Sequence, residues 1–147
     1  VGEDMSEFTS ENFQGWLLKF GTQEFPHELI KQATWKTTPN QRLENDAWTD
    51  NSGYLMRDTM PHTRTKIEFE TVDDLTLDEK IKIQSIMSSS VVNKNQRKAN
   101  ITYWNDEDNE YKSATIYVPD TDFTINEIDK RRNEIYYASI KITLIEY

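Results

Sequence analysis

The chain has 147 residues, of which 35% are hydrophobic and 12% aromatic, a composition that suits one domain with one core and excludes most disordered sequences. Its 26 acidic and 17 basic residues give a formal net charge of -9, which disfavours nonspecific binding to nucleic acid or to an anionic membrane. Because the chain contains no cysteine, disulfides, thiolate zinc sites and thiol catalysis are excluded.

The sequence contains no apolar run near the roughly 18 residues that a bilayer span needs. Its acidic start, Val1–Met5, is also unlike a secretory signal peptide. We therefore expect no membrane partner. Residues 1–12 are polar and predict a flexible lead-in, which is followed by a single domain over residues 13–147.

The first predicted core strand lies within Gln14–Phe20, where Trp16, Leu18 and Phe20 alternate with other residues and so share one face. A turn is expected at Phe25-Pro26, because proline fixes its own φ and keeps the preceding residue extended. The pattern then predicts a second short strand around residues 33–37.

No periodic pattern extends through residues 38–63, where Pro39, Gly53 and Pro61 lead us to expect no long regular structure. A solvated linker would not need the apolar residues of this segment. Two interpretations are open: residues 36–63 are an arm that docks on a neighbouring subunit, or these side chains fold back over the domain's own core. The candidate interface residues are Leu43, Trp48, Tyr54, Leu55 and Met56.

Residues 65–71 alternate as a half-buried strand, and a helix follows. Thr76 and Glu79 have the spacing of a capping box, which predicts a helix start at Leu77. We expect the helix to end at residues 93–98, where cations favour the last carbonyl groups. Its predicted apolar face consists of Leu77, Ile81, Ile83, Met87, Val91 and Val92.

The remaining elements are predicted to be strands. Residues 100–104 and 111–117 flank the acidic connection 105–110, which predicts a β-hairpin with a solvated tip. A strand is expected from Phe123 to Ile128, then a turn at residues 129–133. Residues 134–147 predict one long strand, either central in a sheet or covered on its outer face by another subunit.

The sequence shows no motif for catalysis or for cofactor binding. His27 and His62 lie in no metal-binding spacing, and only 4 glycines are available for a phosphate loop. The acidic run 106–110 lacks the glycine and the final glutamate of a calcium-binding EF-hand loop. We therefore expect no enzyme, no metal and no cofactor.

The order of elements resembles that of small tail proteins of long-tailed bacteriophages, in particular an uncharacterised group that ends in a similar Leu-Ile-Glu. The resemblance covers Trp16 to Tyr147 and rests on the strand at Trp16, the strand 66–69, the helix, the hairpin that begins with Ile101–Trp104, and the ending 142–146. It implies an α+β, mainly β fold of the tail-tube type. Such a fold has two packed antiparallel sheets in a sandwich or barrel, one flanking helix, and a long loop or hairpin that clasps the next subunit in a ring of six.

The resemblance implies a structural protein of the virion tail, either a tail-tube or a distal-tail (baseplate hub) component, assembled in the cytoplasm of the host bacterium. Its partners would be further copies of itself in a hexameric ring and neighbouring tail proteins, with no catalytic residues. An acidic lumen would let DNA pass without adhering. Alternatives are a tail terminator or head-tail connector, an acidic inhibitor that mimics DNA, and a carbohydrate-binding β-domain suggested by 4 tryptophans and 7 tyrosines.

Overall fold

The computed structural model describes residues 10–147, and for residues 44–46 and 58–60 the backbone alone. The strands form two antiparallel sheets, an eight-stranded sheet of order β2-β1-β7-β8-β11-β4-β3, in which β6 also pairs with β7, and a three-stranded sheet of order β5-β10-β9. The strands are β1 (Leu18–Phe20), β2 (Gln23–Glu24), β3 (Lys36–Thr49), β4 (Leu55–Glu70), β5 (Leu75–Thr76), β6 (Val91–Asn93), β7 (Lys98–Asn105), β8 (Glu110–Tyr117), β9 (Ile125–Asp129), β10 (Glu134–Tyr137) and β11 (Lys141–Glu146).

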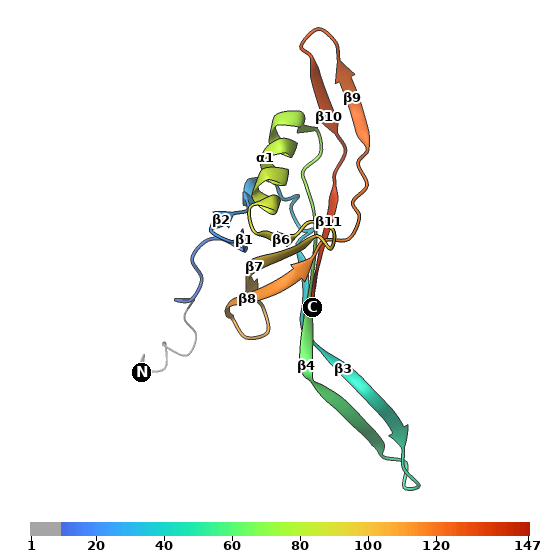
Figure 1. The fold of residues 1–147 in the computed structure, drawn as a ribbon. Helices are drawn as coiled ribbons and strands as arrows, with labels where there is room; N and C mark the ends of the chain where they lie inside the picture. Colours follow the sequence, from blue (N-terminus) through green and yellow to red (C-terminus); the bar gives the residue numbers. More distant parts are fainter. Residues whose placement is uncertain (1–9) are drawn as a thin grey trace, which may run out of the picture.

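The molecule consists of a central body from which two hairpins project in opposite directions (Figure 1). The body holds the helix α1 (Leu77–Ser88), the short 3-10 helix η2 (His27–Leu29) and most of the large sheet. The hairpin of β3 and β4 extends from one end, and the hairpin of β9 and β10 from the other. The prediction of a mainly β fold with antiparallel sheets and a long arm is confirmed, although the large sheet is open, with β2 and β3 as its outermost strands, and does not close into a barrel.

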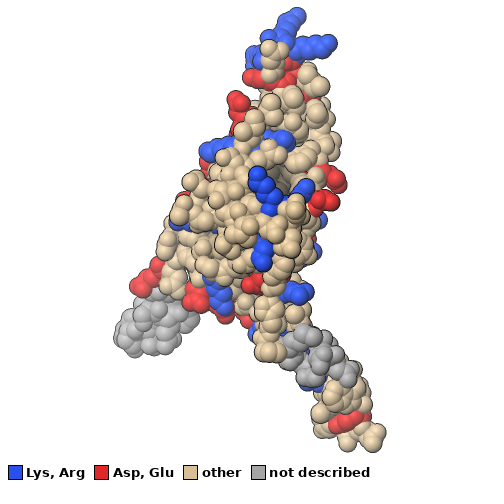
Figure 2. Space-filling model, viewed as in Figure 1, with Lys and Arg blue, Asp and Glu red and all other residues tan. Residues whose placement is uncertain are grey.

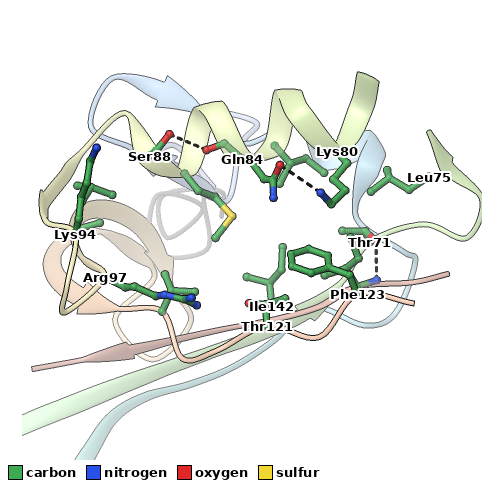
Figure 3. A pocket seen from close by; sticks show the side chains of 16 residues that line it. Thr71, Leu75, Lys80, Gln84, Ser88, Lys94, Arg97, Thr121, Phe123 and Ile142 are labelled. Carbon is green, nitrogen blue, oxygen red and sulfur yellow. Dashed lines mark hydrogen bonds between the residues drawn. The ribbon is translucent and has the colours of Figure 1, made fainter. Parts of the chain in front are cut away.

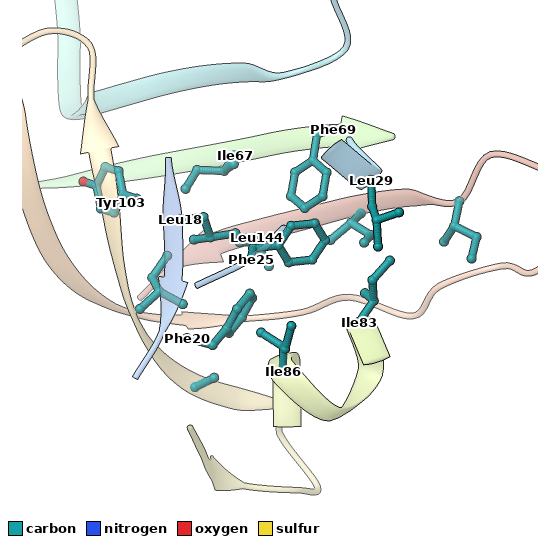
Figure 4. Packing of buried hydrophobic residues seen from close by; sticks show 14 of the residues in the cluster. Leu18, Phe20, Phe25, Leu29, Ile67, Phe69, Ile83, Ile86, Tyr103 and Leu144 are labelled. Atoms are coloured by element: carbon teal, nitrogen blue, oxygen red, sulfur yellow. The ribbon is translucent and has the colours of Figure 1, made fainter. Parts of the chain in front are cut away.

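One hydrophobic core lies between the large sheet and α1 (Figure 4). As predicted, Trp16, Leu18 and Phe20 are all buried. Phe25 packs edge-on against Phe69, with ring centroids 5.1 Å apart. The alternation of apolar residues therefore correctly predicted the buried faces of β1 and of the part of β4 that contains Ile67 and Phe69.

The helix begins as predicted, and its predicted face is correct in part: Ile83 is buried, and Leu77 and Met87 pack against the core. Thr76 accepts from the Glu79 amide and the Glu79 carboxylate accepts from the Thr76 amide, which completes the capping box. The buried helical residues are Ile83 and Ile86, whereas Ile81 is 52% exposed, so its assignment to the helix-sheet contact was wrong. At about 100° per residue around the helix axis, Ile86 lies roughly 60° from Ile83, while Ile81 lies about 160° from Ile83 and so on the opposite side of the helix.

The helix also ends earlier than predicted, at Ser88, so it does not reach residues 93–98. In place of cations, hydroxyl groups bind its last carbonyl groups: Ser88 Oγ donates to the Gln84 carbonyl at 2.8 Å, and Ser89 Oγ to the Ile86 carbonyl at 2.6 Å. The chain then turns into β6, which contains the two valines that had been placed on the helix.

The predicted C-terminal strand is in fact two strands that belong to different sheets. β10 pairs with β9 and β5, while β11 lies between β8 and β4 in the large sheet, so only β11 has the central position that was expected. Between them, the Ile140 amide donates to Thr71 Oγ1 and the Thr71 amide donates to the Ile140 carbonyl, both at 2.9 Å. These bonds fix Ile140, where the chain passes from the small sheet to the large sheet, against Thr71 in the core.

Residues 38–63 are regular, which corrects the expectation that Pro39, Gly53 and Pro61 forbid long strands. All but the turn at residues 50–54 lie within β3 and β4, which pair as one long antiparallel hairpin. The interruptions are accommodated: the register shifts beside Pro39 and again opposite Pro61, and Gly53 lies in the turn with a φ of 87°. The short strand predicted from residue 33 begins at Lys36, because Ala33 has a φ of 65°.

Candidate subunit interface

The projecting part of the β3–β4 hairpin, residues 41–64, is named the arm here. β4 leaves its partner β11 after the pair Lys66–Ile145, and from the pair Gln41–Arg64 onward the two strands continue as a ribbon of their own. With about 10 residues per strand at about 3.3 Å each, the tip lies roughly 30 Å beyond the sheet. Residues 36–38, which were predicted to belong to the arm, pair with β4 inside the large sheet.

The part of β3 from which the arm projects, residues 37–42, is called the base of the arm and is bound to the acidic turn between β7 and β8. Thr37 Oγ1 donates to Asp106 Oδ2 at 2.7 Å, and Asn40 Nδ2 donates to Asp108 Oδ2 at 3.0 Å. Arg42 lies 3.6 Å from a Glu107 carboxylate oxygen. The hairpin tip that the sequence predicted to be merely solvated therefore holds the arm in place.

A buried polar network continues this contact into the core. Asn105 is fully buried, and its Nδ2 donates to Asn40 Oδ1 at 3.2 Å. The backbone amide of Asn40 in turn donates to Thr65 Oγ1 at 3.1 Å, and that hydroxyl is 2.9 Å from the Tyr103 hydroxyl. Asn40 has a φ of 51°, at the register shift where β3 begins to leave the sheet. The network thus fixes the bulge from which the arm projects.

Charge supports the same contact. The pKa of Asp108 is held below its ordinary value, chiefly by a hydrogen bond from the Lys112 ammonium and secondly by one from the side-chain amide of Asn40. The same bond from Lys112 to Asp108 raises the pKa of Lys112. Asp108 is therefore ionised at neutral pH and remains an acceptor for Asn40.

The tip of the arm presents an apolar face. Trp48 pairs directly with Met56, so both side chains lie on the same face of the ribbon, and the exposed Tyr54 lies in the connection between β3 and β4 next to them. We call Trp48, Tyr54 and Met56 the tip face. Leu55 pairs with Thr49 and lies on the opposite face. Two bonds from the Ser52 and Tyr54 amides to Asp50 Oδ1, both 2.9 Å, close the turn.

These tip residues do not cover the core of their own chain. The exposed fractions are 72% for Tyr54, 64% for Leu55, 49% for Trp48 and 40% for Met56. Leu43, nearer the base, is half-buried. The interpretation in which the aromatic residues fold back over the domain's own core is therefore wrong, and the structure leaves the four tip side chains available to another molecule.

The second hairpin ends in a basic tip, which sequence reasoning had identified only as a turn. Lys130, Arg131 and Arg132 are exposed at its free end (Figure 2). Asp129 Oδ1 accepts from the amides of Arg131 and Arg132, at 3.0 and 3.3 Å, and so orders the turn. In the turn of the other hairpin, residues 50–54, the one charged residue is the exposed Asp50, so the two hairpin tips differ in charge.

A cavity of about 480 Å³ lies between α1 and the large sheet (Figure 3). Lys80, Lys94 and Arg97 are the basic residues among those that line it. Lys80 Nζ lies 4.7 Å from the Phe123 ring centroid, and Arg97 lies 3.3 Å from Asp120. The aliphatic lining consists mainly of Leu75, Ile83, Met87, Val91, Ile140 and Ile142. The volume is in the range of pockets that bind apolar groups.

The model of a family of unknown function, DUF6711, matches residues 10–147. The chain belongs to this family. No curated protein matches its sequence. Among solved structures, a chain from the tail of an empty GTA particle with C6 symmetry is similar at a TM-score of 0.48 and 10% identity, over 92% of this chain and 94% of that one. This low similarity leaves the function of the DUF6711 chain to be argued from its own structure.

The described part of the DUF6711 chain contains no group of three or more His, Asp or Glu side chains that could hold a metal ion. Its two histidines have other contacts: His62 Nε2 is 2.7 Å from the Tyr147 carbonyl, and His27 lies 3.8 Å from Glu28. No helix within residues 10–147 is long and apolar enough to cross a membrane. The candidate functional features of the described residues are thus the two hairpins and the cavity.

Proposed function

We propose that the protein is a structural subunit of a bacteriophage tail, in which copies join through the arm into a ring of six around the DNA channel. The observation that carries this proposal is the exposed apolar tip of the arm. Isolated two-stranded hairpins are at best marginally stable in water, and exposed apolar patches mark sites of association. A second molecule that covers Trp48 and Tyr54 supplies the missing burial.

The edges of the large sheet support assembly as well. β2 and β3 are its outermost strands, and such edges offer unpaired backbone groups to another chain. A ring in which copies meet edge to edge would use both edges at once. Tail-tube or distal-tail rings have this design in the family that the sequence resembles, and the number six comes from that resemblance.

The acidic net charge of -9 suits a channel through which DNA passes without specific contact. In this role the protein is not an enzyme. Its partners are copies of itself and adjacent tail proteins, assembled in the cytoplasm of the bacterial host and located in the virion tail.

The proposal is tested by electron microscopy of virions that incorporate a gold-labelled copy of the chain, together with negative staining of the purified protein. We expect the gold on the tail and rings of sixfold symmetry in the purified sample. Gold on the capsid only, or absence of the chain from purified virions, would contradict a role in the tail. Chain on the tail without rings in solution would place assembly under the control of other tail proteins and would contradict self-assembly through the arm.

A further inference from the structure

The cavity beneath α1 has two properties that a partner must match. Its lining is largely apolar, from Ile83 and Met87 on the helix side to Ile140 and Ile142 on the sheet side. Three cations also line it, and Lys94 is exposed. A partner that fits must therefore combine an apolar surface with negative charge.

The tip of the arm combines those two properties. Its tip face is apolar and exposed. The sequence of residues 43–58 is net acidic, with Arg57 as its one basic residue, and the exposed Asp50 lies in the turn itself. Charge complementarity of this kind steers association and selects the partner.

The arm cannot fill the cavity of its own chain. It leaves the body at the end opposite the β9–β10 hairpin, and α1 lies on the other side of the body from the tip (Figure 1). Because the base of the arm is held by Asn40 and Asn105, the hairpin cannot fold back without breaking that network. The occupant must therefore come from a second copy.

We propose that the cavity beneath α1 of one copy receives the tip face of the arm of another copy. Trp48 and Met56 then contact the apolar lining, and the acidic turn faces Lys80, Lys94 and Arg97. The inference rests on the proposed function, since it names the surface that the arm contacts. Two different surfaces are joined, so the contact is head-to-tail, and repeated copies close into a ring or extend as a filament.

A complementation experiment separates the two surfaces. Replacing residues 42–63 by Asn-Gly joins the paired residues Gln41 and Arg64 through a two-residue turn and yields a copy with a cavity but no arm. Met87→Glu yields a copy with an arm and a charged cavity of nearly the same shape. Ile81→Glu, on the exposed face of the same helix, is the matched control.

In sedimentation experiments, each of the first two variants alone should be a monomer, and their equimolar mixture should form a 1:1 dimer. Met87→Glu should weaken self-association by more than about tenfold, because it places a carboxylate against an apolar, acidic partner. Ile81→Glu should assemble like the wild type. Circular dichroism and thermal melts confirm that every variant is folded. Assembly of Met87→Glu at wild-type strength would overturn the cavity as the receptor while leaving the arm contact intact.

Cross-linking provides a second, independent readout, because the chain has no cysteine of its own. A Ser52→Cys copy mixed with a Lys94→Cys copy should form a disulfide-linked heterodimer, whereas Ser52→Cys mixed with Lys130→Cys should not. Cross-linking of Lys94→Cys to a cysteine placed at Ser6, in preference to Ser52→Cys, would make the N-terminal segment the occupant and would overturn the proposal. A wild-type protein that remains monomeric in solution would overturn this proposal and self-assembly through the arm, whereas the role in the tail is decided separately by the gold label on virions.

Discussion

Asn40 Nδ2 donates to Asp108 Oδ2 at 3.0 Å and so joins the base of the arm to a turn 68 residues later in the chain. Behind this bond, Asn105 is fully buried, and its Oδ1 accepts from the Glu107 and Asp108 amides at 3.0 and 3.1 Å. The direction of the arm therefore depends on side chains of the β7–β8 turn, in addition to the backbone pairing of β3 and β4.

Removal of the Asn105 amide should destabilise the fold. In Asn105→Ala, the two turn amides and Asn40 lose their buried partner, and leaving buried polar groups unpaired costs about 1–3 kcal/mol. Chemical denaturation measures the change. Asn126→Ala, which removes an exposed bond to Asp74, should lie within about 0.5 kcal/mol of the wild type. Equal effects of the two substitutions would contradict a structural role for the buried network.

The Asp108 contact should depend on pH in a defined direction. Because the pKa of Asp108 is lowered in the folded state, its contribution is fully present above the ordinary pKa of an aspartate. The contribution is lost as the pH falls through that value and on through the lower folded one. Denaturant midpoints measured from pH 6 down to pH 2 should converge for the wild type and Asp108→Asn at the acid end. A constant difference between them would show that Asp108 does not contribute through its charge.

The helix face is tested by two isoleucines of α1. Ile86→Ala removes a buried side chain of the core and should cost about 2–5 kcal/mol. Ile81→Ala removes an exposed side chain, and alanine favours the helix, so its effect should be near zero. Urea denaturation of both variants gives the comparison, and a larger loss for Ile81→Ala would contradict the observed orientation of the helix.

The helix cap gives a smaller effect. Thr76→Ala removes the hydroxyl that accepts from the Glu79 amide at 3.3 Å and should destabilise the protein by about 1 kcal/mol. Thr76→Ser keeps the hydroxyl and should restore most of the loss in the same melting experiment. If serine and alanine at this position behaved alike, the capping box would not contribute to stability.

The elements that the sequence predicted correctly are those controlled by local patterns. Alternation identified the strand of Leu18 and Phe20 and the strand of Ile67 and Phe69, and the spacing of Thr76 and Glu79 identified the helix start. Strand alternation and helix capping each depend on residues only two or three positions apart, so the sequence alone contains the information that they need.

The errors arose where a rule was applied without its tertiary context. Pro39 and Pro61 were interpreted as strand breakers, although a hairpin tolerates them at register shifts. Ile81 was placed in the core because it is apolar, while Ile86, which is equally apolar, was overlooked. No local signal indicated that Asp106 and Asp108 bind the base of the arm, since this contact joins segments distant in sequence.

The central claim, that copies associate through the arm, is tested most directly by the sedimentation mass of the full chain beside that of the variant with Asn-Gly in place of residues 42–63. The turn joins paired residues and adds little closure entropy, so the variant should keep its cooperative melt. We predict a mass of six copies for the full chain and of one copy for the variant. Assembly of the folded variant to the same mass as the full chain would contradict the claim.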